Sequence, residues 1–408
     1  VPSAVGGGGW SPDGRGSPSV GPLSPVLFAA RPFDPPMEYV QERVATLHAF
    51  GEGAPDAPAD RAAVVVPMTE REYAGLAAER VLSELSALDP ARVIVPLRAP
   101  ADRVGAFREW LDGFDLPLET LWCDGPRVAE LLADAGLAGE RGKGRDVWLA
   151  LGRALDSEYV VVHDADTKSY SREYVRRLLF PLANGFDFSK GYYARVENGR
   201  LYGRLFRLFY TPLVRALRDS APDSEFLEYM AAFRYALAGE FAATGDVVAA
   251  MPVQRTWGLE VGTLAAAYDA VGVDGTAQVD LGSYEHDHRA VSGPTGLSDM
   301  SRSVGAALLR AAEEHGVDPD YDALPDAYRA TAESYVDRYA ADAAFNGLSY
   351  DRSGERDQVR TYAESIAPPG PDTRLPPWDE VALSPGEVAA AATADARDAA
   401  NGELSDDD

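Results

Sequence analysis

Short apolar runs that alternate with stretches of helical spacing constrain the fold of this chain most. Three runs rich in β-branched or aromatic residues lie at 62–68, 91–97 and 118–124, and segments 69–88 and 104–114 between them repeat apolar residues at helical intervals. This order predicts βαβ units with right-handed crossovers, and therefore an α/β fold with an open, mostly parallel sheet covered by helices. Ligands of such sheets bind at the carboxyl ends of the strands.

The pattern continues downstream. Apolar spacing predicts further strands at 159–162, 187–196 and 278–284. We expect helices at 38–50, 144–155, 171–183, 201–219, 257–272, 298–316 and 322–344, and a mostly helical stretch over 225–251.

Composition divides the chain into four parts. Residues 1–35 are rich in Gly, Pro and Ser and indicate a flexible lead-in, while 36–290 contain the alternating pattern and indicate the binding core. Residues 291–370 indicate a helical C-terminal region. Residues 371–408 indicate a short helix followed by a disordered acidic tail.

The charge balance excludes some classes of partner. Asp and Glu number 65 against 38 Lys and Arg, a net charge of −27. Such a chain is poorly suited to binding a phosphate backbone, so we expect no nucleic-acid partner. Acidic excess with only three lysines, at positions 143, 168 and 190, indicates a halophilic protein adapted to concentrated salt.

The compartment follows from three absences in the sequence. No apolar run reaches the roughly 18 residues of a membrane span. The first 20 residues lack the basic start and apolar stretch of a signal peptide. With Cys123 as the single cysteine, no disulfide can form within the chain, and we expect a cytoplasmic protein.

Two carboxylates follow the run at 159–162. Asp164 and Asp166 stand one residue apart where that strand is expected to end. Oxygen ligands of this kind suit Mg²⁺ or Mn²⁺, which leave coordination positions free for substrate phosphates. The alternative is a solvated turn in an acidic chain.

Three other elements favour a phosphate-binding site. Lys143 is flanked by glycines that allow close backbone approach, although the motif could be a simple helix-entry turn. His286 follows a strand and could complete a metal shell, or lie on a surface loop. Gly203 and Arg204 precede a helical stretch, where the guanidinium could bind phosphate or carboxylate, or be one more surface arginine.

The ordered motifs resemble the glucosyl-3-phosphoglycerate synthase family. They are GKG, VVVHDAD, SKGYY, GR with a proline eight residues after the arginine, AGEFAAT, WGLEVGTL, and AQVDLG followed by a histidine, and they span about 60–316. The resemblance implies a GT-A type glycosyltransferase fold, a UDP-glucose donor, 3-phospho-D-glycerate as acceptor, retention of configuration and a homodimer. It also implies Mg²⁺ or Mn²⁺, and for a salt-adapted chain a role in making a compatible solute.

The resemblance also implies roles for single residues. Asp164, Asp166 and His286 match the metal ligands, and Glu240 and Glu260 occupy the acidic places of GEF and GLEVG. The remaining roles fall into three groups: catalysis by Asp166, Lys143 and Glu260; donor binding by Pro67, Glu70, Lys143, Asp164 and Asp166; and acceptor binding by Gly203, Arg204 and His288.

Several positions depart from the family pattern and keep alternatives open. Phe206 stands where the family has threonine. The family's Asn-Glu pair after the nucleotide-turn proline is absent from PMTERE, where Glu70 or Glu72 could take over its function. The next strand ends in VPLRAPAD, where the family has Asp-Ser-Gly. After His286, only Arg289 keeps the type of the family's basic-Asn-basic run. One alternative is a nucleotide-sugar transferase with another acceptor: glycerate, another phosphorylated molecule or a lipid phosphate. The others are a donor-binding regulator without turnover and an acidic α/β protein with chance motifs.

Overall fold

A computed structural model describes residues 42–49, 55–285 and 294–404 of the chain. All described residues belong to one compact unit. The predicted lead-in and the last four residues of the acidic tail lie outside the described residues. The proposed domain boundaries stay a prediction.

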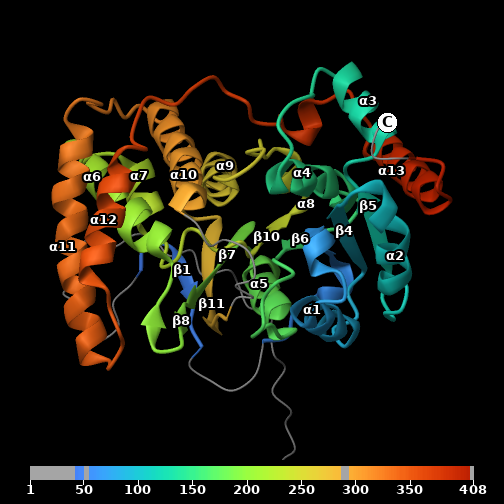
Figure 1. The fold of residues 1–408 in the computed structure, drawn as a ribbon, viewed down its shortest axis with the longest axis horizontal. Helices are drawn as coiled ribbons and strands as arrows, with labels where there is room; N and C mark the ends of the chain where they lie inside the picture. The colour runs from blue at the N-terminus through green and yellow to red at the C-terminus, as the bar shows by residue number, and fades with distance from the viewer. Residues whose placement is uncertain (1–41, 50–54, 286–293, 405–408) are drawn as a thin grey trace, which may run out of the picture. The chain divides into compact units, whose positions relative to one another are not determined.

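The described part of the chain contains a nine-stranded, mostly parallel sheet, which confirms the expected α/β fold (Figure 1). Its order is β1-β11-β7-β10-β6-β2-β4-β3, with β5 paired to β4, and β10 is antiparallel to both neighbours. The strands are β1 (Ala45–Leu47), β2 (Ala62–Val65), β3 (Met68–Thr69), β4 (Arg92–Arg98), β5 (Leu118–Trp122), β6 (Tyr159–Val162), β7 (Phe188–Ala194), β10 (Phe241–Thr244) and β11 (Thr276–Ser283). Every residue of β2 and β6 is buried, as continuous apolar runs in a parallel sheet require.

Two secondary-structure predictions were wrong. Residues 45–47, expected within a helix, form β1 and pair in parallel with β11. Residues 241–244, expected in a mostly helical stretch, form β10 between β6 and β7. In both places alanines suit a helix, but pairing with a neighbouring strand outweighs that weak local preference.

Helices surround the sheet and extend beyond it. In Figure 1, α6, α7, α11 and α12 group beside one another, while α2, α3 and α13 gather around β5. The helices are α1 (Leu76–Ser86), α2 (Ala101–Leu111), α3 (Pro126–Asp134), α4 (Lys143–Ala154), α5 (Glu173–Ala183), α6 (Thr211–Ser220), α7 (Glu225–Ala231), α8 (Gly245–Ala249), α9 (Leu259–Val271), α10 (Pro294–Glu314), α11 (Leu324–Phe345), α12 (Arg352–Ala363) and α13 (Pro385–Ala400). None of the described helices is long and apolar enough to cross a membrane.

The C-terminal segment packs against α4 and against the backbone at Val253. Trp378 stacks on Trp148 of α4 with ring centroids 4.1 Å apart, and its indole N–H donates to the Trp148 carbonyl oxygen at 2.8 Å. Leu375 forms a backbone bridge with Val253. These contacts fix α4, which begins at Lys143.

Asp395 of α13 caps the amino end of α3. Its carboxylate, fully buried, accepts hydrogen bonds from the backbone N–H groups of Arg127 at 2.9 Å and Val128 at 3.2 Å. It also accepts a bond from the Arg127 guanidinium at 2.9 Å. A carboxylate at this place satisfies donors that a helix leaves unpaired and interacts favourably with the helix dipole.

We predict that Asp395→Ala lowers the free energy of unfolding by about 2–3 kcal/mol, because it leaves buried N–H groups without an acceptor. Chemical denaturation at constant salt measures the change. Asp398→Ala, which removes a more exposed partner of Arg127, is the matched control and should cost less than about 1 kcal/mol. Equal losses in both variants would contradict this role for Asp395.

Candidate active site

The sheet topology brings the predicted site residues to one edge. Asp164 and Asp166 follow β6 at its carboxyl end, and Pro67 follows β2, the parallel neighbour of β6. Because β10 is antiparallel, with Phe241 opposite Val162, the residue before it, Glu240, lies at the same edge.

Two helices direct their amino ends toward this edge. Each precedes a parallel strand and runs back across the sheet, so α4 and α9 begin near the carboxyl ends of β6 and β11. The Lys143 ammonium lies 2.5 Å from Asp164 Oδ1 and 3.6 Å from Glu260 Oε1. The structure therefore brings together Lys143, Asp164 and Glu260, which were predicted separately.

Glycine allows α4 to begin where it does. A Cβ on Gly144 would overlap the carbonyl oxygen of Gln254, and the next residue, Arg145, donates its backbone N–H to the Arg255 carbonyl at 2.9 Å. A larger residue would push the helix away from this loop. The second glycine of GKG thus serves backbone packing, which holds Lys143 in place.

The cluster balances buried charges. Burial disfavours the Lys143 ammonium, but Asp164 and Glu260 outweigh this effect and raise the pKa of Lys143 well above its usual value. Lys190 on β7 is 1% exposed and donates to the Ala238 carbonyl oxygen at 2.5 Å; burial lowers the pKa of Lys190 to about 8. Two of the three lysines are therefore structural parts of this site.

Glu240 is fully buried beside these lysines. Among the described residues, neither of its carboxylate oxygens has a hydrogen-bond partner. Burial and the nearby Asp164 carboxylate raise the pKa of Glu240, while Lys143 and Lys190 oppose that shift. A buried acid without protein partners is a candidate to bind a polar ligand.

His163 has a partner within the protein at both ring nitrogens, and Nδ1 lies 3.3 Å from the Asp164 carbonyl oxygen. Its ring is fully buried and Nε2 lies 2.9 Å from the Tyr170 hydroxyl. Burial lowers the pKa of His163 to about 4, so the ring is neutral at physiological pH. Its role is to fix the end of β6.

Asp164 and Asp166 fit a hard divalent cation by their chemistry and by the space around them. Both provide carboxylate oxygens, and a Cβ on Gly239 would lie 2.8 Å from Asp164 Oδ2, so glycine leaves that carboxylate room. No group of three or more His, Cys, Asp or Glu within 42–49, 55–285 and 294–404 is arranged to hold a metal. The predicted third ligand, His286, lies outside these residues.

The chain just before His286 is bound to the chain just after Asp166. The Thr167 hydroxyl donates to the Tyr284 hydroxyl at 3.1 Å, and the Lys168 backbone N–H donates to the Glu285 carbonyl oxygen at 2.8 Å. The Glu285 N–H donates to the Ser169 hydroxyl at 3.0 Å. Residues distant in sequence thus meet at the edge that carries Asp164.

The predicted nucleotide turn lies beside β6. Pro67 separates β2 from β3, and Glu70 begins a short 3₁₀ helix, Glu70–Glu72, as an exposed residue. Glu72 instead accepts hydrogen bonds from the Thr69 backbone N–H at 2.6 Å and hydroxyl at 2.8 Å. Glu72 is therefore used in capping, and of the two candidates Glu70 has the exposed carboxylate.

Gly203 and Arg204 precede a π-helical turn, Leu205–Tyr210. Gly203 has φ +76°, and a Cβ there would lie 2.8 Å from the Tyr235 hydroxyl, so the turn requires glycine. Arg204 Nε lies 3.4 Å from Glu355 Oε1 of α12. His288, the third predicted acceptor residue, lies outside the described residues.

A tyrosine cluster at this site was missed by sequence reasoning. Tyr193 stacks on Tyr284 with centroids 4.0 Å apart and contacts Tyr235 at 5.0 Å. The cluster connects the turn at Gly203 with the segment after Asp166. The signal was the aromatic pair in SKGYY, but the partners of Tyr193 lie 42 and 91 residues further along the chain, which spacing alone does not reveal.

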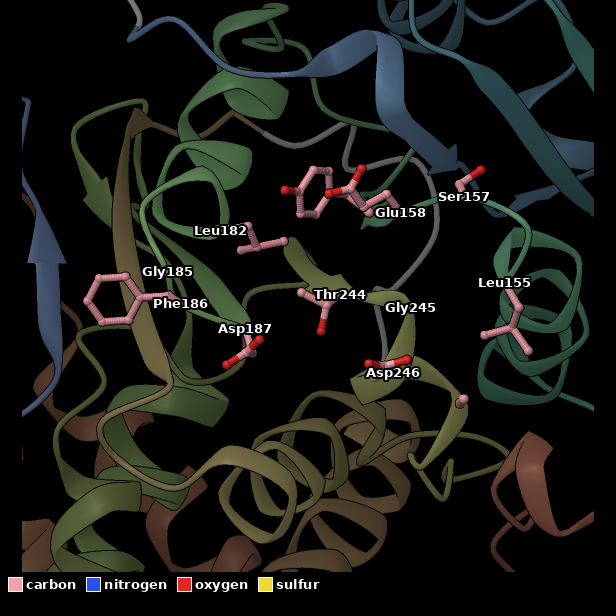
Figure 2. Close-up of a pocket in the computed structure, with 12 residues that line it drawn as sticks. Leu155, Ser157, Glu158, Leu182, Gly185, Phe186, Asp187, Thr244, Gly245 and Asp246 are labelled. Atoms are coloured by element: carbon pink, nitrogen blue, oxygen red, sulfur yellow. The ribbon is translucent and has the colours of Figure 1, made fainter. Parts of the chain in front are cut away.

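A separate pocket of about 490 Å³ lies at the other edge of the sheet (Figure 2). Tyr159, at the amino end of β6, and Thr244, at the carboxyl end of β10, both line it. Asp187 and Asp246 add acidic side chains. Since Asp164 follows the opposite end of β6, this pocket is not part of the predicted site.

Relatives of known function support the resemblance. Glucosyl-3-phosphoglycerate synthase of Methanococcoides burtonii is 32% identical over 379 residues, covering 84% of this chain and 91% of that protein. The Persephonella marina enzyme of the same name is 33% identical over 321 residues, 74% of this chain and 79% of its own length. No family model matches the chain.

Solved structures support the fold. A crystal structure of Mycobacterium tuberculosis glucosyl-3-phosphoglycerate synthase in complex with Mn²⁺, UDP-glucose and phosphoglyceric acid aligns with a TM-score of 0.52 at 23% identity. It covers 69% of this chain and 90% of that one. Another, in complex with Mg²⁺ and UDP, aligns with a TM-score of 0.51 at 24% identity, covering 68% and 88%. With its GT-A type fold and its 32% identity to the Methanococcoides burtonii enzyme over most of both chains, the chain belongs to the glucosyl-3-phosphoglycerate synthase family of glycosyltransferases.

Proposed function

We propose that the chain transfers glucose from UDP-glucose to 3-phospho-D-glycerate with retention of configuration, in a reaction that depends on Mg²⁺ or Mn²⁺. The observation that supports it most is the arrangement of Lys143, Asp164 and Glu260 at the carboxyl edge of the sheet, in a chain 32% identical to a synthase of this name. Open α/β sheets bind their ligands at this edge.

Asp164 and Asp166 would hold the divalent ion, with His286 as a third ligand. The hydrogen bonds that tie Tyr284 and Glu285 to the residues after Asp166 support the assignment of His286. The bound ion supplies Lewis-acid stabilisation of the negative charge that builds on the departing diphosphate.

Lys143 adds a positive group beside the same diphosphate. Its ammonium is held on one side by Asp164 and on the other by Glu260, so it is positioned before the donor binds. Pre-oriented charge stabilises a developing anion without reorganisation during the reaction. Pro67 and Glu70 would contact the nucleotide from the end of β2.

Gly203, Arg204 and His288 would bind the anionic acceptor. The acceptor's hydroxyl would then lie within attack distance of the sugar, and this positioning supplies most of the rate enhancement. We assign no covalent nucleophile, and propose that the hydroxyl attacks on the face from which the diphosphate departs.

One observation favours a second candidate function, transfer to a different acceptor. Phe206, where the family pattern has threonine, is buried and packs against Tyr235 with centroids 4.7 Å apart. It offers no hydroxyl to an acceptor phosphate. Glycerate, another phosphorylated small molecule or a lipid phosphate would then replace 3-phosphoglycerate.

The acidic composition supports a proposal about the salt concentration in which the protein works. With a net charge of −27, the protein is suited to concentrated salt, where screening reduces self-repulsion. We propose that it is a cytoplasmic homodimer whose product serves as precursor of a compatible solute. Assays therefore belong in high salt.

We predict that the purified chain forms glucosyl-3-phosphoglycerate from UDP-glucose and 3-phosphoglycerate, and that EDTA stops the reaction until Mg²⁺ or Mn²⁺ is restored. Mass spectrometry and NMR of the product identify the acceptor and the anomeric configuration. Parallel reactions replace 3-phosphoglycerate by glycerate or glycerol 3-phosphate as acceptor, or UDP-glucose by GDP-mannose as donor. Product with glycerate but none with 3-phosphoglycerate would replace the first function by the second.

We predict that Asp166→Asn lowers kcat at least 10²-fold and weakens the Mn²⁺ dependence of UDP binding, because the amide is a poorer ligand than a carboxylate. Steady-state kinetics and calorimetry measure the two effects. The matched control is Asp246→Asn, at the opposite edge of the sheet, which should leave both unchanged. Wild-type turnover in the Asp166 variant would remove it from the metal site.

We predict that Lys143→Met lowers kcat about 10²- to 10³-fold, since it removes a pre-oriented charge beside the leaving group. Thermal melting at constant salt monitors the fold, and Arg302→Met removes an exposed positive charge on α10 as the control. If kcat changes less than about threefold in a folded variant, Lys143 serves only to balance the carboxylates.

A further inference from the structure

The β8–β9 hairpin places a second arginine near Gly203 and Arg204. Strands β8 (Val196–Glu197) and β9 (Arg200–Leu201) pair with Val196 opposite Leu201, and the turn at 198–199 has φ values of +50° and +67°. The next pair outward is Arg195 and Tyr202, joined by a backbone hydrogen bond of 2.9 Å. Arg195 therefore lies directly across the hairpin from the turn that begins at Gly203.

Arg195 is surrounded by aromatic side chains. Its guanidinium carbon lies 5.6 Å from the centroid of the Tyr284 ring, and Nη1 lies 3.5 Å from the Tyr235 hydroxyl, at the limit of a hydrogen bond. Its Nε is buried and has no hydrogen-bond partner among the described residues. Burial of an arginine N–H without an acceptor is unfavourable unless a ligand supplies one.

The two neighbouring arginines share one carboxylate. Arg207 binds both carboxylate oxygens of Glu355, at 2.9 and 3.2 Å, and Arg204 shares one of them at 3.4 Å. Across residues 42–49, 55–285 and 294–404, no carboxylate forms an ion pair with Arg195. Within the part of the chain that the structure describes, Arg195 therefore differs from Arg204 and Arg207 in having no carboxylate partner.

Tyr284 connects Arg195 to the segment that follows the predicted metal ligands. The Tyr284 ring that Arg195 contacts carries the hydroxyl that accepts a bond from Thr167, the residue after Asp166. A small anion between Arg195 and Arg204 would therefore lie close to the donor end of the site.

We propose that Arg195 binds an anionic group of the acceptor directly and is a specificity-determining residue of the acceptor subsite. This inference rests on the proposed function, because it assumes a small acidic acceptor. A guanidinium binds carboxylate or phosphate through two parallel N–H donors. The neighbouring tyrosines would exclude water from the Arg195 guanidinium and orient it. This contact would compensate for the hydroxyl contact to the acceptor that Phe206 does not provide.

The test measures acceptor kinetics for Arg195→Met and Arg195→Lys in the full chain at high salt. We expect KM for 3-phosphoglycerate to rise about 10- to 100-fold in the methionine variant. The rise should be smaller in the lysine variant, which keeps the positive charge but loses the two parallel N–H donors of the guanidinium. KM for UDP-glucose and UDP binding should stay within about twofold. Arg200→Met, an exposed arginine on the same hairpin, is the matched control.

Two truncated acceptors identify the group that Arg195 binds. Glycerate lacks the phosphate and glycerol 3-phosphate lacks the carboxylate. The substitution should reduce kcat/KM strongly for the acceptor that keeps the bound group, and weakly for the other. Equal, small changes for both acceptors would contradict a direct contact.

The outcomes separate the two proposals. Wild-type transfer to 3-phosphoglycerate with an unchanged acceptor KM in folded Arg195 variants would overturn this inference and leave the proposed function intact. Absence of wild-type transfer to every acidic acceptor would overturn both. Variants that melt at the wild-type temperature but lose UDP binding would also contradict it, since Arg195 would then act on the donor.

Discussion

The site depends on one ion pair, between Lys143 and Asp164. Asp164, Glu240 and Glu260 converge at the carboxyl edge of the sheet, where three unscreened carboxylates would repel one another. The Lys143 ammonium, shared by Asp164 and Glu260, makes that convergence possible, and Lys190 supports it from β7. The Lys143–Asp164 pair therefore reduces the repulsion among these carboxylates before any ligand binds.

Elements far from the chemistry hold this pair in place. Gly144 lets the start of α4 pack on the loop at Gln254, and Leu375 bridges to Val253 just before that loop. Trp378 stacks on Trp148 in the middle of the same helix. The C-terminal segment thus stabilises the helix that carries Lys143, so its loss would affect turnover as well as stability.

Much of the fold follows from local patterns, because strands buried on both faces must be continuously apolar. That rule located β2, β4 and β6, and with β6 the position of Asp164. It failed for β10, whose alanines suit a helix until two neighbouring strands pair with them. The tyrosine cluster around Arg195 was not predictable, since Tyr193 comes from β7, Tyr235 from a turn and Tyr284 from the residue after β11.

A crystal structure of the chain with Mn²⁺ and UDP-glucose at high salt tests the central claim most directly. We expect an anomalous peak in contact with Asp164 and Asp166, and the Lys143 ammonium within hydrogen-bond distance of the diphosphate. A nucleotide bound elsewhere, for example in the pocket between Tyr159 and Thr244 at the opposite edge of the sheet, would contradict it.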